Sequence, residues 1–237
     1  MVPEKLIDEF VGRVRDAVGG NLKSAILYGS AAAGDYVPEH SDVNLLFVLG
    51  ETSFAAIATL APAVEWWAKQ KHHAPLLMTA EELRRGADVF SIEFLDMREN
   101  YRVLWGEDLL KGLEIPMKFH RAQVEYELRE KTILLRQRLL VVARDEDAKW
   151  ELLVRSVGAF ATLARHALIA LGETAVSKRE AVQKLAAKAG FDAGAFLQLF
   201  DLRERKVDRK TINVDDLFAR YLKAVERITA AVDEMLD

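Results

Sequence analysis

The sequence predicts a two-part protein of the α+β or α/β class: a mixed sheet with helices over residues 1–112, then an all-α helical bundle over residues 113–237. Two short apolar runs, residues 24–28 and 43–49, have strand length and are separated by helical patterns, as in an α/β layer. From Met117 onward only helical periodicity is found. Gly112 and Pro116 punctuate the chain between the two patterns, so we expect the domain boundary there.

The N-terminal part is expected to contain helices and strands in turn. Apolar residues recur at helical spacing from Leu6 to Val18, and Gly19-Gly20 ends that helix. A second helix is expected over residues 54–71, and Thr79-Ala-Glu-Glu82 is a capping box that opens a brief third one. The apolar run Phe90–Met97 is interpreted as another strand.

The C-terminal part is expected to be a bundle of five helices. Ser177-Lys-Arg-Glu180 is a second capping box, and Gly190 ends the helix that it opens. The expected helices cover residues 117–143, 149–171, 177–190, 193–205 and 214–236.

Composition and charge exclude several classes of protein. The 237 residues include no cysteine, which rules out disulfides, thiolate zinc sites and a catalytic thiol. The charged N-terminus lacks the apolar core of a signal peptide, and Pro62 and Glu65 interrupt the longest apolar stretch, so we expect a cytoplasmic protein without membrane contact. A net charge of −4 without a strong basic face argues against nucleic acid as the main partner.

One segment carries the chemistry, from Leu27 to Val48. A strand runs into Gly29-Ser30, where the glycine lets a ligand approach the backbone and the serine hydroxyl can donate a hydrogen bond. On the next strand, Asp42 and Asn44 are two residues apart and therefore point to the same face, about 7 Å apart along the chain. Their oxygens could face a metal ion together.

These residues resemble the signature of the polymerase-beta-type nucleotidyltransferase superfamily, particularly its small bacterial and kanamycin-nucleotidyltransferase-like members. The resemblance implies transfer of a nucleoside monophosphate from a nucleoside triphosphate to a hydroxyl or other acceptor, with Mg²⁺ or Mn²⁺. It implies that Gly29 and Ser30 bind the nucleotide, that Asp42 and Glu93 are catalytic, and that Asp42, Asn44 and Glu93 hold the metal. Glu93 is preferred as the third acid because of its Ser-Ile-Glu-Phe context, with Asp96 as the alternative.

Two departures from the family pattern leave an alternative open. Asn44 replaces the second aspartate, and Ala33 stands where small members often have an arginine. The alternative is therefore a catalytically degenerate nucleotide-binding or interaction module, antitoxin-like or regulatory. If the protein is an enzyme, we expect its acceptor to be a small molecule or a protein. The sequence leaves open whether the protein forms a homodimer.

The remaining conspicuous side chains are given structural interpretations. His72-His73 have no metal-ligand spacing to a third histidine and are assigned no function. Trp66, Trp67 and Trp105 lie on apolar faces and are expected in the core.

Overall fold

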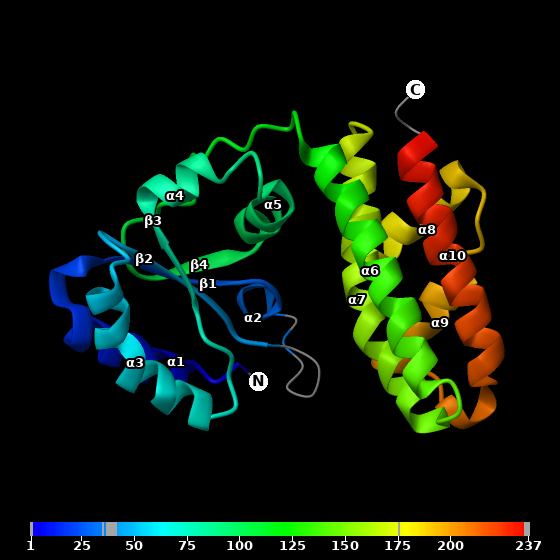
Figure 1. Ribbon diagram of the computed structural model, residues 1–237, viewed down its shortest axis with the longest axis horizontal. Coiled ribbons are helices and arrows are strands. Elements are labelled where there is room, and N and C mark those ends of the chain that lie inside the picture. Colours follow the sequence, from blue (N-terminus) through cyan, green and yellow to red (C-terminus); the bar gives the residue numbers. More distant parts are fainter. Residues whose placement is uncertain (1, 35, 37–41, 175, 235–237) are drawn as a thin grey trace. The chain divides into compact units, whose positions relative to one another are not determined.

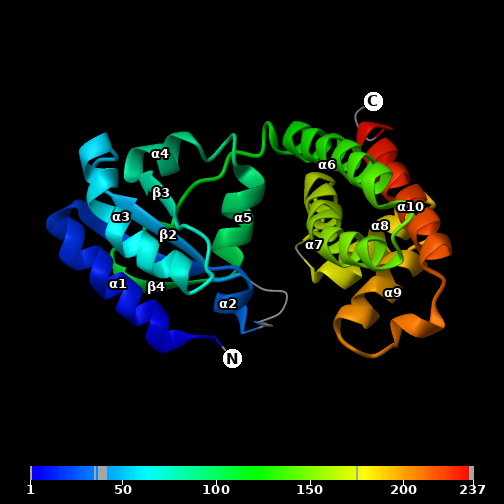
Figure 2. The same cartoon turned by 60° about the horizontal axis from the view of Figure 1, so that its bottom comes forward.

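The protein consists of two compact units, Met1–Pro116 and Met117–Asp237. The computed structural model describes residues 2–34, 36, 42–174 and 176–234, and Figures 1 and 2 show its elements from two sides. The first unit combines a four-stranded sheet with helices, and the second consists of helices. The predicted fold class, a mixed sheet followed by a helical bundle, is confirmed.

A mixed sheet forms the centre of the first unit, with strand order β3-β2-β1-β4. β1 pairs antiparallel with both β2 and β4, whereas β3 runs parallel to β2. The strands are β1 (Leu22–Tyr28), β2 (Asn44–Leu49), β3 (Leu76–Thr79) and β4 (Tyr101–Gly106). The middle strands β1 and β2 are therefore covered on both edges, in line with their almost continuous apolar sequences.

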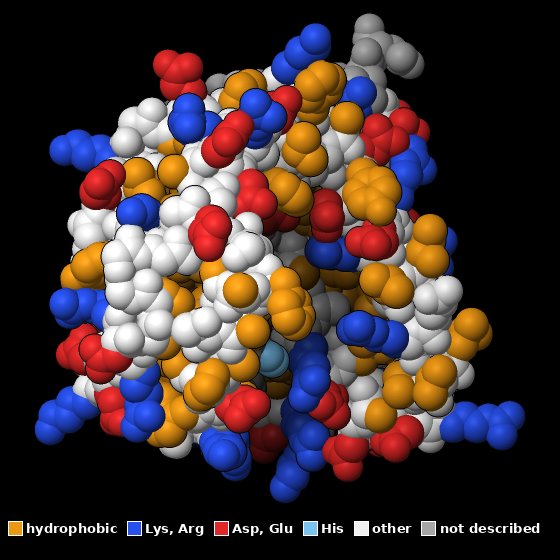
Figure 3. Space-filling model, turned by 60° about the vertical axis from the view of Figure 1, so that its left-hand side comes forward, with side chains coloured by type: hydrophobic (Ala, Val, Ile, Leu, Met, Phe, Trp, Pro, Cys, Tyr) orange, Lys and Arg blue, Asp and Glu red, His pale blue; other side chains and the backbone are white. Residues whose placement is uncertain are grey.

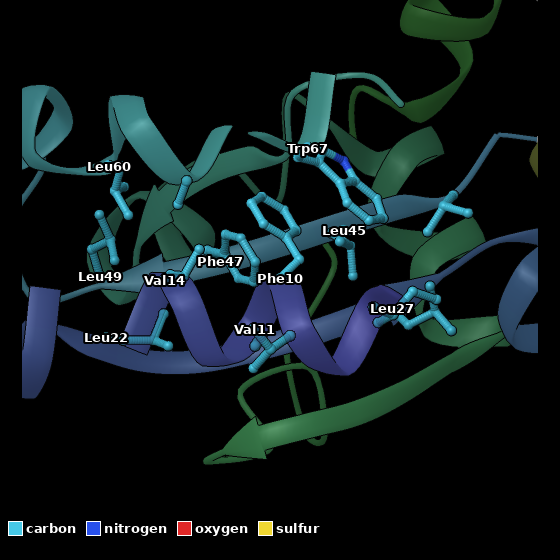
Figure 4. Close-up of a cluster of buried hydrophobic side chains, with 14 of the residues drawn as sticks. Phe10, Val11, Val14, Leu22, Leu27, Leu45, Phe47, Leu49, Leu60 and Trp67 are labelled. Carbon is cyan, nitrogen blue, oxygen red and sulfur yellow. The ribbon is translucent and has the colours of Figure 1, made fainter. Parts of the chain in front are cut away.

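Each face of the sheet has its own apolar cluster, because successive strand side chains point to opposite sides. Leu27, Leu45 and Phe47 pack beneath α1 (Glu4–Val18) and α3 (Phe54–Lys69), together with Phe10 and Trp67 (Figure 4). The alternate residues Ile26, Leu46 and Val48 pack on the other face. There they meet side chains of α4 (Ala80–Arg85) and α5 (Ser91–Glu99), which lie across the sheet from α1 and α3 in Figure 1.

Several local predictions for this unit are confirmed. Thr79 and Glu82 form the expected capping box: the Glu82 amide donates to the Thr79 hydroxyl, and the Glu82 carboxylate accepts from the Thr79 amide. Gly19 follows the last residue of α1, leading into the short 3₁₀ turn η1 (Gly19–Asn21). A four-residue helix, α2 (Ser30–Ala33), follows Gly29 directly.

The predicted strand over Phe90–Met97 is wrong, because residues Ser91–Glu99 form helix α5. The buried positions Ser91, Phe94 and Met97 are three apart, which is helical spacing, and a short apolar run does not distinguish the two states. The strand comes next, as β4, which places Trp105 in the sheet. β4 ends at Gly106, whose φ of +80° and close approach to the Lys23 carbonyl leave no room for a side chain.

The second unit contains the five predicted helices, one of which is buried and central. α7 contacts the other four helices of the unit and carries most of its buried side chains. By length and hydropathy alone α7 could cross a membrane, but 61% of its most apolar window is buried, as expected for the core helix of a bundle. The helices are α6 (His120–Val142), α7 (Glu146–Ala170), α8 (Lys178–Ala189), α9 (Gly194–Arg203) and α10 (Val214–Glu234), with the 3₁₀ turn η2 (Arg209–Thr211) before α10.

Candidate functional site

The turn at Gly29-Ser30 lies at the end of β1, where the chain leaves the sheet and enters α2. Gly29 has φ +76° and ψ −152°, a conformation that is essentially restricted to glycine. Its amide donates to the carbonyl of Asn100 at the start of β4, and its carbonyl accepts from the amides of Ala32 and Ala33. This leaves Ser30 at the first helical position, where backbone amides precede the first intrahelical hydrogen bond and can meet an anion.

Asn44 lies directly beside this turn. It begins β2 and is the register partner of Tyr28, the last residue of β1. The Asn44 Nδ2 atom is 3.2 Å from the position that a Cβ on Gly29 would occupy, so the glycine is also needed for this close approach. The two halves of the sequence motif therefore meet at one end of the β1–β2 pair.

Asp42 lies two residues before β2 in an exposed position. Its carboxylate is 66% exposed, and its Oδ1 atom is 3.5 Å from Nε2 of His73. Ser41, the motif residue before it, lies outside the described residues. Asp42 is thus an accessible carboxylate whose described ionic neighbour is an imidazole.

His72 and His73 were assigned no function from the sequence, but the pairing of β2 with β3 brings them to this site. In that parallel pair Leu46 is level with Leu76, an offset of 30 residues, so the chain before β3 runs beside the chain before β2. The buried Trp67 fixes that chain: its ring stacks on His72 at 4.2 Å between centroids, and its Nε1 donates to the carbonyl of His73. The sequence alone does not show that these histidines lie near Asp42, because their position depends on the register of β3 against β2.

The pKa of His72, whose ring stacks on Trp67, is lowered. Burial lowers the pKa of His72, and the neighbouring His73 lowers it further, while the charge of Asp42 acts in the opposite direction. The neutral imidazole is therefore favoured beside the tryptophan ring.

Glu93 lies on helix α5 and not on the strand where it was predicted. It is exposed, and its negative charge, together with the larger effect of burial, raises the pKa of the Tyr28 hydroxyl. Tyr28 is paired with Asn44, so the charge of Glu93 acts on the Asn44 side of the site, whereas Asp42 lies beside His73. Asp96, the alternative third acid, is on the same helix and half-buried.

Comparison with known proteins gives one curated relative and a match to a solved structure, while no family model matches the chain. A candidate protein adenylyltransferase of Methanocaldococcus jannaschii is 42% identical over 60 residues. This match covers 25% of the chain described here and 58% of the relative, so the chain spans little more than half of the relative's length.

The structural match extends over both chains almost completely. The spectinomycin adenyltransferase AAD(9) from Enterococcus faecialis, in a crystal structure with ATP and spectinomycin, superposes with a TM-score of 0.62. It covers 97% of this chain and 99% of AAD(9), at 13% sequence identity. The chain has the nucleotidyltransferase fold. The resemblance first indicated by Gly29-Ser30 and Asp42-Val43-Asn44 is thereby confirmed.

The donor set at the nucleotidyltransferase motif suits a hard divalent cation. Asp42 and Glu93 offer carboxylate oxygens and Asn44 a carbonyl oxygen, the ligand types that Mg²⁺ and Mn²⁺ prefer. Asp42 is exposed enough to reach such an ion. However, within the described ranges no group of three or more histidine, aspartate or glutamate side chains is close enough to hold a metal ion. A cation here would depend on the neutral oxygen of Asn44 or on ligands from the nucleotide.

Away from the predicted site residues, the surface has a cavity and a mixed distribution of charge. A cavity of about 550 Å³ in the helical unit lies between the end of α8 and α10, and none of the predicted site residues lines it. Its lining includes Phe191 and the cations Arg220, Lys223 and Arg227. On the face shown in Figure 3, acidic and basic side chains are interspersed.

Proposed function

We propose that the protein is a nucleotidyltransferase that transfers AMP from ATP to a hydroxyl group of a small molecule or of a protein side chain. The observation that supports this most is the meeting of Gly29-Ser30 with Asn44, two residues from Asp42, at one end of the β1–β2 pair. The two similar proteins support adenylyl transfer, and they differ in acceptor: one is a candidate protein adenylyltransferase and the other acts on spectinomycin. The proposed domains are residues 1–112 for the nucleotidyltransferase part and 113–237 for the helical part, and we place the protein in the cytoplasm.

In the proposed reaction the acceptor oxygen attacks the α-phosphorus of ATP. The bond between the α-phosphorus and the bridging oxygen breaks, pyrophosphate leaves, and the hydroxyl proton passes to a carboxylate. Glu93 is the proposed base, with Asp96 as the alternative on the same helix. Ser30 and the first amides of α2 would hold phosphate oxygens through hydrogen bonds.

Asp42, Asn44 and Glu93 are the residues that would hold Mg²⁺ or Mn²⁺. When bound, the ion would neutralise phosphate charge and orient the triphosphate. The chain's own contribution is to hold these oxygens on adjoining elements, with Asn44 fixed by its place opposite Tyr28.

The experiment is transfer of label from ATP radiolabelled at the α-phosphate, with an aminocyclitol antibiotic and total cell protein as acceptors. Asp42→Ala is expected to reduce transfer by at least about 100-fold, since it removes the exposed carboxylate of the motif. Asp8→Ala is the matched control, because Asp8 is an exposed acid on α1 outside the motif, and it should leave transfer unchanged. Transfer that survives Asp42→Ala undiminished would place the reaction elsewhere in the chain.

A second candidate function is nucleotide binding without turnover, and Asn44 is the observation that favours it. Asparagine keeps an oxygen ligand but lacks the charge on which hard cations mainly depend. The two functions are separated by Asn44→Asp, followed by calorimetric titration with Mg²⁺ and ATP. A gain of about tenfold or more in cation affinity, together with the appearance of transfer, favours the degenerate module, while full activity of the natural sequence refutes it.

A further inference from the structure

The second half of helix α6 carries a row of apolar side chains that nothing in its own unit covers. Leu140 and Val141 are 82% and 86% exposed, Ile133 is 54% exposed and Leu134 is 40% exposed. Single exposed apolar residues are ordinary, but two exposed apolar pairs on one face of a helix indicate an interaction surface. Ile133 and Leu140 are seven residues apart, as are Leu134 and Val141, which is the spacing of a helix-pairing seam.

The order of residues along this strip reads the same in both directions. From Gln137, the pairs Ile133-Leu134 and Leu140-Val141 lie three and four residues away on either side. Seven residues before and after Gln137 come Glu130 and Arg144, which carry opposite charges. Steps of three, four and seven residues stay on one face of a helix, so the positions from Glu130 to Val141 form one surface of α6. Arg144 lies in the turn that follows this end of the helix.

We propose that this surface, the Glu130–Arg144 strip, pairs with the same strip of a second copy of the chain, with the two helices antiparallel and a two-fold axis passing at Gln137. Ile133 and Leu134 of one copy then pack against Leu140 and Val141 of the other. The axis brings Gln137 of one copy against Gln137 of the other, where two amides can exchange hydrogen bonds. A two-fold interface requires a self-complementary surface, and a strip that is symmetric in its apolar pairs and opposite in its end charges meets that requirement.

The charges at the two ends of the Glu130–Arg144 strip also support a second copy of the chain as the partner. Glu130 and Arg144 are exposed and form no ion pair with any residue in the described part of the chain. Two neighbouring charges on α6 are already matched: Lys131 pairs with Glu127, and Arg136 pairs with Glu226 on α10. The antiparallel arrangement places Glu130 of each copy opposite Arg144 of the other, twice across the axis.

The size of the strip sets the expected strength of the dimer. The thirteen residues of the strip that are helical, from Glu130 to Val142, span about 20 Å, and a single helix pair of that length buries less than the roughly 800 Å² per partner of a standard interface. We therefore expect a reversible dimer with a dissociation constant on the order of micromolar. The inference depends on α6 alone and is independent of the proposed catalytic activity.

The first experiment is sedimentation equilibrium of the full chain over a range of concentrations. The natural sequence should pass from monomer to dimer, and the double variant Leu140→Glu, Val141→Glu should weaken the dimer by at least about 100-fold, because it places four carboxylates in the seam. Phe54→Glu is the matched control, since Phe54 is 89% exposed on α3 outside the strip, and it should leave the dissociation constant unchanged. A monomer at every concentration, or a dimer that survives the double variant, would overturn the proposal.

Charge reversal tests the antiparallel direction. Glu130→Arg sets two arginines against each other at each end and should weaken the dimer by about tenfold. Adding Arg144→Glu to the same chain restores opposite charges and should return the dissociation constant to within about threefold of the natural value. Failure of the second change to restore the dimer contradicts the antiparallel pairing.

Cross-linking tests the axis, and the cysteine-free chain makes it straightforward. Gln137→Cys should give a covalent dimer in high yield with a short bis-maleimide, because the two thiols face each other across the axis. Lys111→Cys, an exposed position in the first unit, is the control and should remain largely uncross-linked. A chain that forms dimers but is not cross-linked through Gln137→Cys uses a different surface, which would refute the proposed strip.

Discussion

At the scale of single residues, the site depends on one glycine. Gly29 adopts backbone angles that other residues rarely reach, and the missing side chain lets Asn44 approach the turn. The same backbone geometry starts α2 immediately after β1. Position 29 therefore requires glycine for two separate reasons, its backbone conformation and its close contact with Asn44.

Gly29→Ala is expected to lower the free energy of unfolding by about 2–3 kcal/mol, because alanine is strained at these angles and its Cβ crowds Nδ2 of Asn44. Gly34→Ala is the control: Gly34 also has positive φ but faces open space, so only a left-handed backbone penalty of about 1–2 kcal/mol applies. Urea unfolding measures both. Equal losses in the two variants would mean that the contact with Asn44 contributes nothing.

His72 gives the first unit a specific sensitivity to acid. Its pKa is lowered in the folded protein by burial, so the unfolded chain takes up a proton first as the pH falls. The stabilisation is present above the unfolded pKa of about 6.5 and is lost as the pH falls through the lowered pKa. His72→Phe keeps a ring beside Trp67 but does not titrate.

Unfolding free energies measured between about pH 7.5 and 5.5 should therefore decline less for His72→Phe than for the natural protein. The remaining decline reports the other groups that titrate in this range. Parallel curves for the two proteins would show that His72 is not the group responsible.

The residues of the site were predictable where local sequence determines them and not where strand pairing does. Gly29, Ser30, Asp42 and Asn44 lie in one segment whose turn and strand signals are local. The position of His73 beside Asp42 depends on the register of β3 against β2, which no short pattern encodes. The roles of these residues in binding and catalysis stay predictions.

At the scale of secondary structure elements, helices with clear caps and periods were predictable throughout. The segment predicted as a strand over Phe90–Met97 was not predictable in this way, because it forms helix α5. Nine residues with apolar side chains at close spacing fit either state, and tertiary packing decides, since Phe94 and Met97 join the cluster beneath the sheet. β4 was missed because its side chains are only half-buried on an edge of the sheet.

Gly106 is the residue on which the attachment of β4 depends. A Cβ at this position would be 2.1 Å from the Lys23 carbonyl oxygen, and because that oxygen belongs to the backbone, no change of rotamer relieves the clash. Gly106→Ala should cost at least about 3 kcal/mol of stability and speed hydrogen exchange of β4 amides relative to those of β2.

Gly112→Ala is the matched control for that element, because Gly112 has a φ of +78° but nothing within 4 Å. It should cost only about 1–2 kcal/mol and leave β4 protected. If the two alanine variants behave alike, the approach of β1 to β4 at Gly106 is looser than the distances indicate.

At the scale of the whole molecule, two units with separate cores are joined by an irregular segment around Lys111 and Lys118. Lys111 lies between Leu110 and Leu113, which are both buried in the first unit, while the residues around Lys118 are exposed until His120. Limited trypsin digestion should therefore cut after Lys118 before it cuts after Lys111.

Mass spectrometry of the early fragments decides the order. Lys118→Gln should slow the first cut in this segment, and Lys111→Gln, the control, should not. A first cut after Lys111 would mean that Leu110 and Leu113 do not hold the segment against the sheet.

The stacking of Trp67 between Phe10 and His72 has a spectroscopic consequence. The indole is shielded from water, yet it touches the histidine that leads to Asp42 through its neighbour. A charged imidazole quenches an adjacent indole, so the emission of this tryptophan should dim when His72 takes up a proton. The natural chain thus contains its own optical reporter, Trp67, which stacks on the residue next to the histidine that neighbours Asp42, and it needs no attached dye.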